Sequence, residues 1–189
     1  TVTWAFTPTW RNSGKQHNLY LRVEDVAGAS DGWNDHGDWV INRTPNWLRP
    51  PDLRNQTIYA GVRYTFNPRY RDLDKWQNLD VLYFAIDDHL PDGSMDGGVY
   101  LKYVQSEDRM YLYKEGVGWI GGFQPGTLVF PENDFVKVIG KWSKVGVFDA
   151  KTRTVKWRLE FKPAFAGYHK LYMRAVDRFP ECNGDTGWK

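Results

Sequence analysis

The residues with the clearest capacity for chemistry are four aspartates in one short loop. The stretch DDHLPDGSMDGG, residues 87–98, contains Asp87, Asp88, Asp92 and Asp96. Calcium is bound by several carboxylate oxygens of a flexible loop, so these side chains could hold a Ca²⁺ ion. The spacing does not fit an EF-hand, which requires a glutamate at the twelfth loop position. Because Asp and Gly are also the residues that tight turns require, a solvated turn is the alternative interpretation.

Motifs for cofactor binding or catalysis are weak. GVGWIG, residues 116–121, fits the dinucleotide-binding pattern G-x-G-x-x-G, but that pattern binds a pyrophosphate only where a helix follows. Pro125 and the absence of a helical period predict a glycine-rich hairpin or loop instead. None of the four histidines lies in a nucleophile motif, and neither G-x-S-x-G nor H-E-x-x-H occurs. We therefore expect no enzyme activity and no organic cofactor; an enzyme of another type would need a deep cleft with converging polar groups.

Ten tryptophans make aromatic contacts the other candidate chemistry. Exposed rings could stack on the apolar face of a sugar, or they could bind a neighbouring subunit, where Trp and Tyr are common hot spots. The candidate contact residues are those in or near predicted loops: Trp10, Trp33, Trp39, Trp47 and Trp119.

These loops must be positioned by strands. The run VKWRLEF places Val155, Trp157, Leu159 and Phe161 on one face and charged residues on the other. A period of two with many β-branched and aromatic residues predicts strands. Residues 69–80 are the best candidate for a helical turn, and no window has a sustained helical period. The sequence thus predicts an all-β protein, an antiparallel sandwich or barrel. The other predicted strands are residues 18–25, 57–66, 80–88, 98–104, 109–114 and 170–177.

The beginning of the chain is similar to its end. TVTWAFTP (1–8) matches TVKWRLEFKP (154–163), and NLYLRVED (18–25) matches KLYMRAVD (170–177). SDGW (30–33) then matches DTGW (185–188). Collinear matches of this kind indicate an internal repeat. We therefore expect residues 1–42 to be the C-terminal half of a preceding repeat, residues 43–56 to be a proline-rich linker, and residues 57–189 to be a complete repeat.

Both copies of this pattern resemble a known repeat. The C-terminal copy reads FKPAFAGYHKLYMRAVDRFPECNGDTGW, and the N-terminal copy reads FTPTWRNSGKQHNLYLRVEDVAGASDGWNDHGDW. Between them lie GVYLKY, LYLYKEGVGWIGG and PEND. Together these segments resemble the tandem repeat of very large secreted bacterial surface proteins. The resemblance implies an immunoglobulin-like or fibronectin-like β-sandwich at the cell surface or outside the cell. That family often carries a cysteine pair where this chain has Val99 and Val136, so a hydrophobic pair is expected to replace the disulfide. Cys182 is the only cysteine of the chain.

The overall charge narrows the choice of partner. Lys and Arg number 25 and Asp and Glu number 23, which gives a net charge of +2 and no electrostatic reason to expect nucleic acid or an anionic membrane. No apolar stretch is long enough to span a membrane.

Our main hypothesis is a non-enzymatic, extracellular structural or adhesive protein. It would be a repeat of a long surface protein, or a self-assembling filament subunit joined to further copies through residues 1–42. We favour subunit contacts for the tryptophans because an incomplete N-terminal half needs a partner. The alternative is a carbohydrate-binding module that uses the same aromatic residues on surface glycans.

Overall fold

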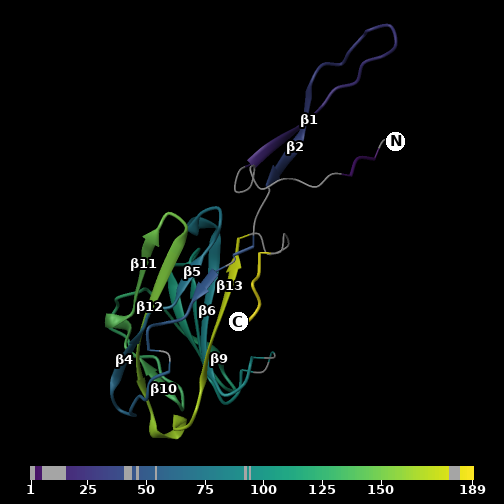
Figure 1. Ribbon diagram of the computed structural model, residues 1–189. Helices are drawn as coiled ribbons and strands as arrows, with labels where there is room; N and C mark the ends of the chain where they lie inside the picture. The colour runs from purple at the N-terminus through teal and green to yellow at the C-terminus, as the bar shows by residue number, and fades with distance from the viewer. Residues whose placement is uncertain are drawn as a thin grey trace. The chain divides into compact units, whose positions relative to one another are not determined.

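The structure is a computed structural model that describes residues 3–5, 16–40, 44–45, 47–53, 55–91, 93, 95–178 and 184–189. The chain forms two compact units, residues 1–43 and 44–189. Every strand pair in the described residues is antiparallel, and helical structure there is limited to three-residue 3-10 turns. The prediction of an all-β antiparallel protein is confirmed (Figure 1). Within the described part, no helix is long and apolar enough to cross a membrane.

The described residues of the first unit include a hairpin, formed by β1 (Gln16–Leu21) and β2 (Asn34–Val40). Its register shifts between Asn18 and Tyr20, and Gly37 on β2 has a φ of +111°. A residue with a side chain rarely adopts this backbone conformation, so glycine is favoured at this bulge.

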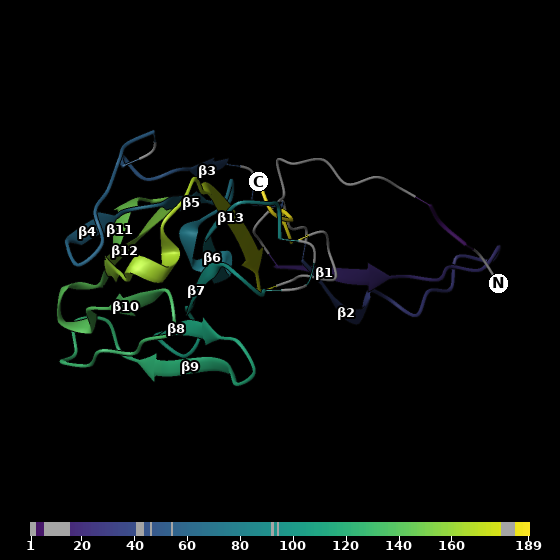
Figure 2. The same ribbon diagram turned by 90° about the horizontal axis from the view of Figure 1, so that it is seen from below.

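The first sheet of the second unit has the strand order β13-β6-β7-β8-β9. Neighbours β6 to β9 follow one another along the chain, and the last strand, β13, joins β6 at the far edge (Figure 2). Residues 116–121 lie in the β8–β9 hairpin, so the predicted glycine-rich hairpin is confirmed. The strands are β6 (Leu79–Asp87), β7 (Val99–Val104), β8 (Arg109–Lys114), β9 (Gly118–Phe123) and β13 (Lys170–Asp177).

The second sheet is built around the long strand β12 (Thr152–Phe161). β12 pairs with β10 (Val136–Val138) and β11 (Lys144–Asp149) along one edge. Along the other edge it pairs with β4 (Arg63–Phe66) and β5 (Arg69–Arg71). The 3-10 turns are η2 (Trp76–Asn78), η3 (Gly140–Trp142) and η4 (Pro163–Phe165). Residues 69–80, the predicted helical turn, thus contain η2 but also strand β5.

The segment predicted as a linker is part of the second unit. β3 (Trp47–Arg49) pairs with β5, Leu48 packs against the core and Pro51 is buried. Proline fixes an extended backbone and cannot donate a ladder hydrogen bond, which restricts it to positions such as the end of this edge strand. The structure therefore differs from the predicted boundary at residue 57, and the second unit begins at Thr44.

The two sheets of the second unit pack on each other through a shared apolar core. Phe66 of β4 lies 5.6 Å from Phe84 of β6, between ring centroids, and Trp157 of β12 is fully buried. Val99 and Val136, at the positions where the resembling family carries cysteines, both belong to this core. Apolar burial therefore stabilises the region where the cysteines are missing.

Candidate assembly surface

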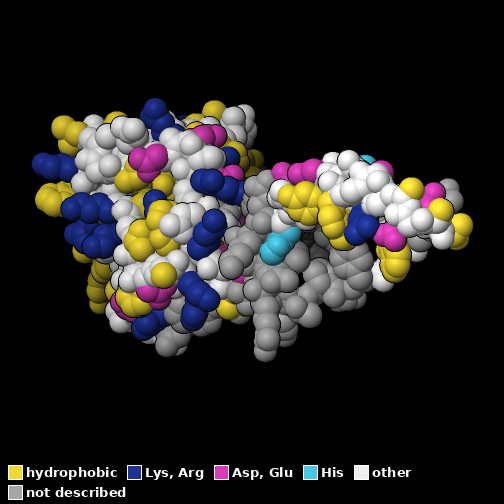
Figure 3. Space-filling view, turned by 90° about the horizontal axis from the view of Figure 1, so that it is seen from above, with side chains coloured by type: hydrophobic (Ala, Val, Ile, Leu, Met, Phe, Trp, Pro, Cys, Tyr) yellow, Lys and Arg dark blue, Asp and Glu magenta, His cyan; other side chains and the backbone are white. Residues whose placement is uncertain are grey.

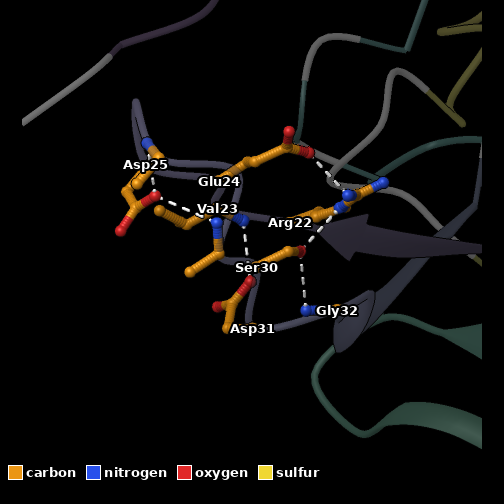
Figure 4. A network of polar contacts seen from close by, with 9 residues as sticks. Arg22, Val23, Glu24, Asp25, Ser30, Asp31 and Gly32 are labelled. Carbon is orange, nitrogen blue, oxygen red and sulfur yellow. Dashed lines mark hydrogen bonds and ion pairs between the residues drawn. The ribbon is translucent and has the colours of Figure 1, made fainter.

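The hairpin of the first unit is held by a set of polar contacts next to its turn (Figure 4). Arg22 Nε donates to Ser30 Oγ at 2.7 Å, and the backbone N–H of Gly32 donates to the same hydroxyl at 3.1 Å. The N–H of Val23 donates to Asp31 Oδ1 at 2.8 Å, while the N–H of Asp31 donates to the carbonyl of Val23 at 3.2 Å.

The same contacts occur at the C-terminal end of the second unit. Arg174 Nε donates to Asp185 Oδ1 at 3.0 Å, and the N–H of Gly187 donates to that oxygen at 2.9 Å. The N–H of Ala175 donates to Thr186 Oγ1, and the N–H of Thr186 donates to the carbonyl of Ala175, both at 3.0 Å. Each contact is the counterpart of one in the first hairpin.

The backbone ladders match in the same way. Glu24 forms an isolated bridge with Ser30, and Val176 forms one with Asp185. Leu21 pairs with Asn34, and Met173 exchanges two backbone hydrogen bonds with Lys189. Residues 21–24 with 30–34, and residues 173–177 with 184–189, are thus two copies of one hydrogen-bond arrangement.

The copies differ in what covers them. In the second unit Tyr172, Met173 and Ala175 are 9%, 3% and 0% exposed. Their counterparts Tyr20, Leu21 and Val23 are 49%, 47% and 68% exposed. The positions are apolar in both copies, but only the second copy is covered by a packed sheet.

The strand edges show the same difference. β13 is paired on one edge with β6 and on the other with the chain end, through backbone bonds of Met173, Ala175 and Asp177. Among the described residues β1 pairs only with β2. In the described part of the chain, the edge of β1 that corresponds to the β6 side of β13 is therefore an open strand edge, which can template pairing with another strand.

The N-terminal end of the repeat departs from the prediction. Trp4, which matches the buried Trp157 in the sequence, is exposed, and residues 3–5 do not belong to a strand. A strand forms only where a neighbouring strand satisfies its backbone groups, and the counterparts of β4 and β10 are not among the described residues of this unit.

One ion pair distinguishes the two copies. Arg174 and Asp185 approach to 2.5 Å; this contact lowers the pKa of Asp185 and raises the pKa of Arg174. The first copy has the neutral Ser30 at that position, and Arg22 makes its ion pair with Glu24, also at 2.5 Å.

Of the candidate tryptophans, the structure describes the side chains of Trp33 and Trp119. Trp33 is exposed, whereas Trp119 is half-buried against Tyr113, Tyr83 and Lys102. The ring of Trp119 is thus part of an aromatic cluster on the outer face of the first sheet, a cluster that alternation along single strands could not predict. Trp10 lies outside the described residues, as do the side chains of Trp39 and Trp47.

The aspartate-rich loop is organised by Asp87. Asp87 accepts a hydrogen bond from the Tyr100 hydroxyl and one from the N–H of Asp88 at 2.7 Å, as a carboxylate that caps a turn does. Gly98 leaves room for this carboxylate, because a Cβ at that position would collide with it.

Ligand atoms of Asp87, Asp88 and His89 lie within 4.8 Å of one another, and the hydrogen bond from His89 lowers the pKa of Asp88. Asp96 is exposed, and Asp92 lies outside the described residues. The calcium site remains a prediction, and the contacts of Asp87 fit the turn interpretation.

A hollow of about 650 Å³ lies at one end of the second unit. His169 stacks on Phe165 there at 3.9 Å between ring centroids, and its Nε2 lies 3.2 Å from the carbonyl oxygen of Phe165. The described residues that line the hollow include Lys162, Tyr59 and Tyr168 but no carboxylate. They therefore provide no pair of acidic groups for acid–base catalysis.

Comparison with known proteins adds no identification: no protein family, no curated protein and no solved structure matches this chain. Function must therefore be inferred from the repeated hairpin and from the surfaces of the two units.

Proposed function

We propose that this chain is a non-enzymatic structural protein that joins like modules at the cell surface or outside the cell. In this proposal each module is an immunoglobulin-like β-sandwich, and residues 16–40 are the C-terminal part of one whose first part is supplied by another copy of the module. The observation that carries the proposal is the repeated hydrogen-bond set around Arg22 and Arg174, next to apolar strand residues that are buried in one copy and exposed in the other.

The energetics favour such joining. A two-stranded hairpin is marginally stable in water on its own. Burying an apolar side chain such as Leu21 or Val23 contributes about 1.5–3 kcal/mol. A strand added along the open edge of β1 would also satisfy its unpaired backbone groups. Both apolar burial and backbone pairing therefore favour completion of the hairpin, and the linkage that forms is directional.

The joined copies can belong to a filament or to one long polypeptide with tandem repeats. The extracellular location follows from the sequence resemblance alone. A carbohydrate-binding module remains the alternative, although the half-buried ring of Trp119 offers a poor stacking platform.

The test is the size of the native material, by electron microscopy and mass measurement. We expect filaments or a polypeptide far larger than the 22.1 kDa of this chain. For a filament, the double variant Leu21→Asp/Val23→Asp should abolish assembly, whereas Val117→Asp, at an equally exposed valine in the second unit, should not. A compact native monomer of 22.1 kDa would refute the proposal.

A further inference from the structure

The outer face of the second sheet concentrates positive charge that the net charge of the chain conceals. On β12 the buried residues Val155, Trp157 and Leu159 alternate with Lys156 and Arg158, which therefore point outward. Residues opposite each other in an antiparallel pair share a face. Because Lys144 is opposite Lys156, both ammonium groups lie on this outer face.

A second like-charge pair extends the same face. Arg49 of β3 is opposite Arg69 of β5, and Arg69 is in turn opposite Thr154 of β12. Like charges directly opposite each other destabilise a sheet. Two such pairs on one face indicate that the face is arranged for something other than the stability of the sheet.

The positive charge surrounds a hollow of about 390 Å³. Its lining is Arg63, Thr65, Trp142, Lys144, Lys156 and Arg158, with no acidic residue. Glu160, the acid next to it on β12, is paired with Arg63 at 2.8 Å. Lys144 and Lys156 have no ion pair among the described residues. Figure 3 shows Lys and Arg side chains together with hydrophobic ones on the side of the larger unit where β11 and β12 lie in Figure 1.

We propose that this outer face, centred on Lys144, Lys156 and Arg158, binds an acidic polysaccharide. Outward residues on one strand repeat about every 6.7 Å. The row of cations that begins at Arg63 and ends at Arg69 is therefore roughly 20 Å long. A row of this length fits an extended polyanion better than a single small anion.

The aromatic residues of this face select the class of polymer. Trp142 is 53% exposed at the edge of the hollow and can pack on the apolar face of a sugar ring. The neighbouring Phe148 is 55% exposed, and the Arg69 guanidinium lies over its ring at 3.9 Å from the centroid. A single-stranded nucleic acid is usually bound by several open rings that stack successive bases, and a double helix by an element that enters its groove. Among the described residues that line the hollow, Trp142 is the only aromatic one, and the face is a sheet surface.

The test is calorimetric titration of the full chain with polygalacturonate, dextran sulfate, neutral dextran and oligothymidylate. We expect binding to the two acidic polysaccharides at about 50 mM salt, its loss at about 500 mM salt, and no binding to dextran. The double variant Lys144→Gln/Lys156→Gln should weaken binding about tenfold, because two ionic contacts are lost. Lys114→Gln/Lys170→Gln, which removes the same charge from the first sheet, is the matched control and should change binding less than about twofold.

Three results would overturn the proposal. They are no binding of either acidic polysaccharide at low salt, equal weakening by the two double variants, or tighter binding of oligothymidylate than of the polysaccharides. The last result would assign the face to nucleic acid. The thermal midpoint of each variant shows whether it is folded, and removal of the Lys144–Lys156 repulsion should not lower it.

Discussion

Trp33 and Trp188 occupy the same position of a repeated hairpin, but only Trp188 has a packed environment. The Trp188 ring lies 5.7 Å from Tyr83 and 6.2 Å from Tyr100, both in edge-to-face geometry. Trp33 is 69% exposed. Tyr83 and Tyr100 belong to β6 and β7 in the first sheet of the second unit. In the proposed assembly, a neighbour with the character of β6 and β7 would cover the exposed Trp33.

The two tryptophans should respond differently to substitution. Trp188→Ala removes two aromatic contacts and partly buried apolar area, so it should lower the free energy of unfolding of the second unit by about 2 kcal/mol. Trp33→Ala should change the free energy of unfolding by less than about 0.5 kcal/mol in the isolated chain. Urea unfolding followed by circular dichroism measures both, and equal effects would contradict the difference in burial.

Replacing Asp185 by the residue found in the other copy tests their equivalence. In Asp185→Ser a hydroxyl can accept from Arg174 and from the Gly187 N–H, as Ser30 does from Arg22 and Gly32. Asp185→Ser should lower the free energy of unfolding by less than about 1 kcal/mol, because the Arg174–Asp185 ion pair is partly exposed. Asp185→Ala should lower the free energy of unfolding further.

The pH dependence of the same variant has a defined sign. The pKa of Asp185 is lowered in the folded state, so its contribution to stability is present above the ordinary aspartate pKa of about 4 and is lost as the pH falls below it. Asp185→Ser should lack this acid-dependent loss. A variant curve parallel to that of the parent chain from pH 2 to pH 5 would contradict the assignment.

Asp72 should make the second unit less stable as the pH rises. Burial raises the pKa of Asp72 to about 6, and the neighbouring Asp74 and Asp177 add to the shift. A raised folded-state pKa means that the contribution of Asp72 is fully present below about pH 4 and is lost as the pH rises through about 6. The loss is about 2 to 3 kcal/mol.

Asp72→Asn should remove this pH dependence. An asparagine oxygen can still accept from the N–H groups of Asp74 and Lys75 without a buried charge. The variant should be more stable than the parent chain at pH 7 and equal to it near pH 4, as measured by urea unfolding at both pH values. If the parent chain shows no decline between pH 4 and pH 7, the proposed effect of burial is wrong.

The Lys144–Lys156 pair predicts a stabilising substitution. Lys156→Glu replaces a like-charge pair across β11 and β12 with an opposite-charge pair, so it should raise the free energy of unfolding by about 0.5 kcal/mol. The gain should shrink at about 1 M salt, where exposed charges are screened. Lys114→Glu, opposite the uncharged Gly118, is the control; an equal gain in both variants would attribute the effect to net charge.

Sequence alternation located the strands whose two faces differ in polarity, such as β12 and β13. It extended β4 too far, because Ala60–Val62 form a turn in which Gly61 has a φ of +74°. The repeat was visible because its anchors are large or turn-forming residues. Burial was not visible, since Tyr20 and Tyr172 are the same residue type in different surroundings. The cationic face was missed because strand register, which one sequence does not determine, brings Lys144 opposite Lys156.

The central claim is that the first hairpin is completed by the first part of a like module. Its most direct test is a chain in which a second copy of residues 44–153 precedes Thr1, with hydrogen exchange measured at the β1 amides. In the register of β13 with β6, the N–H groups of Tyr20 and Arg22 would face the added strand. We predict that their exchange slows by at least about a hundredfold and that Trp33 becomes shielded from quenchers. Unchanged exchange at Tyr20 and Arg22 in a folded fusion would contradict the account.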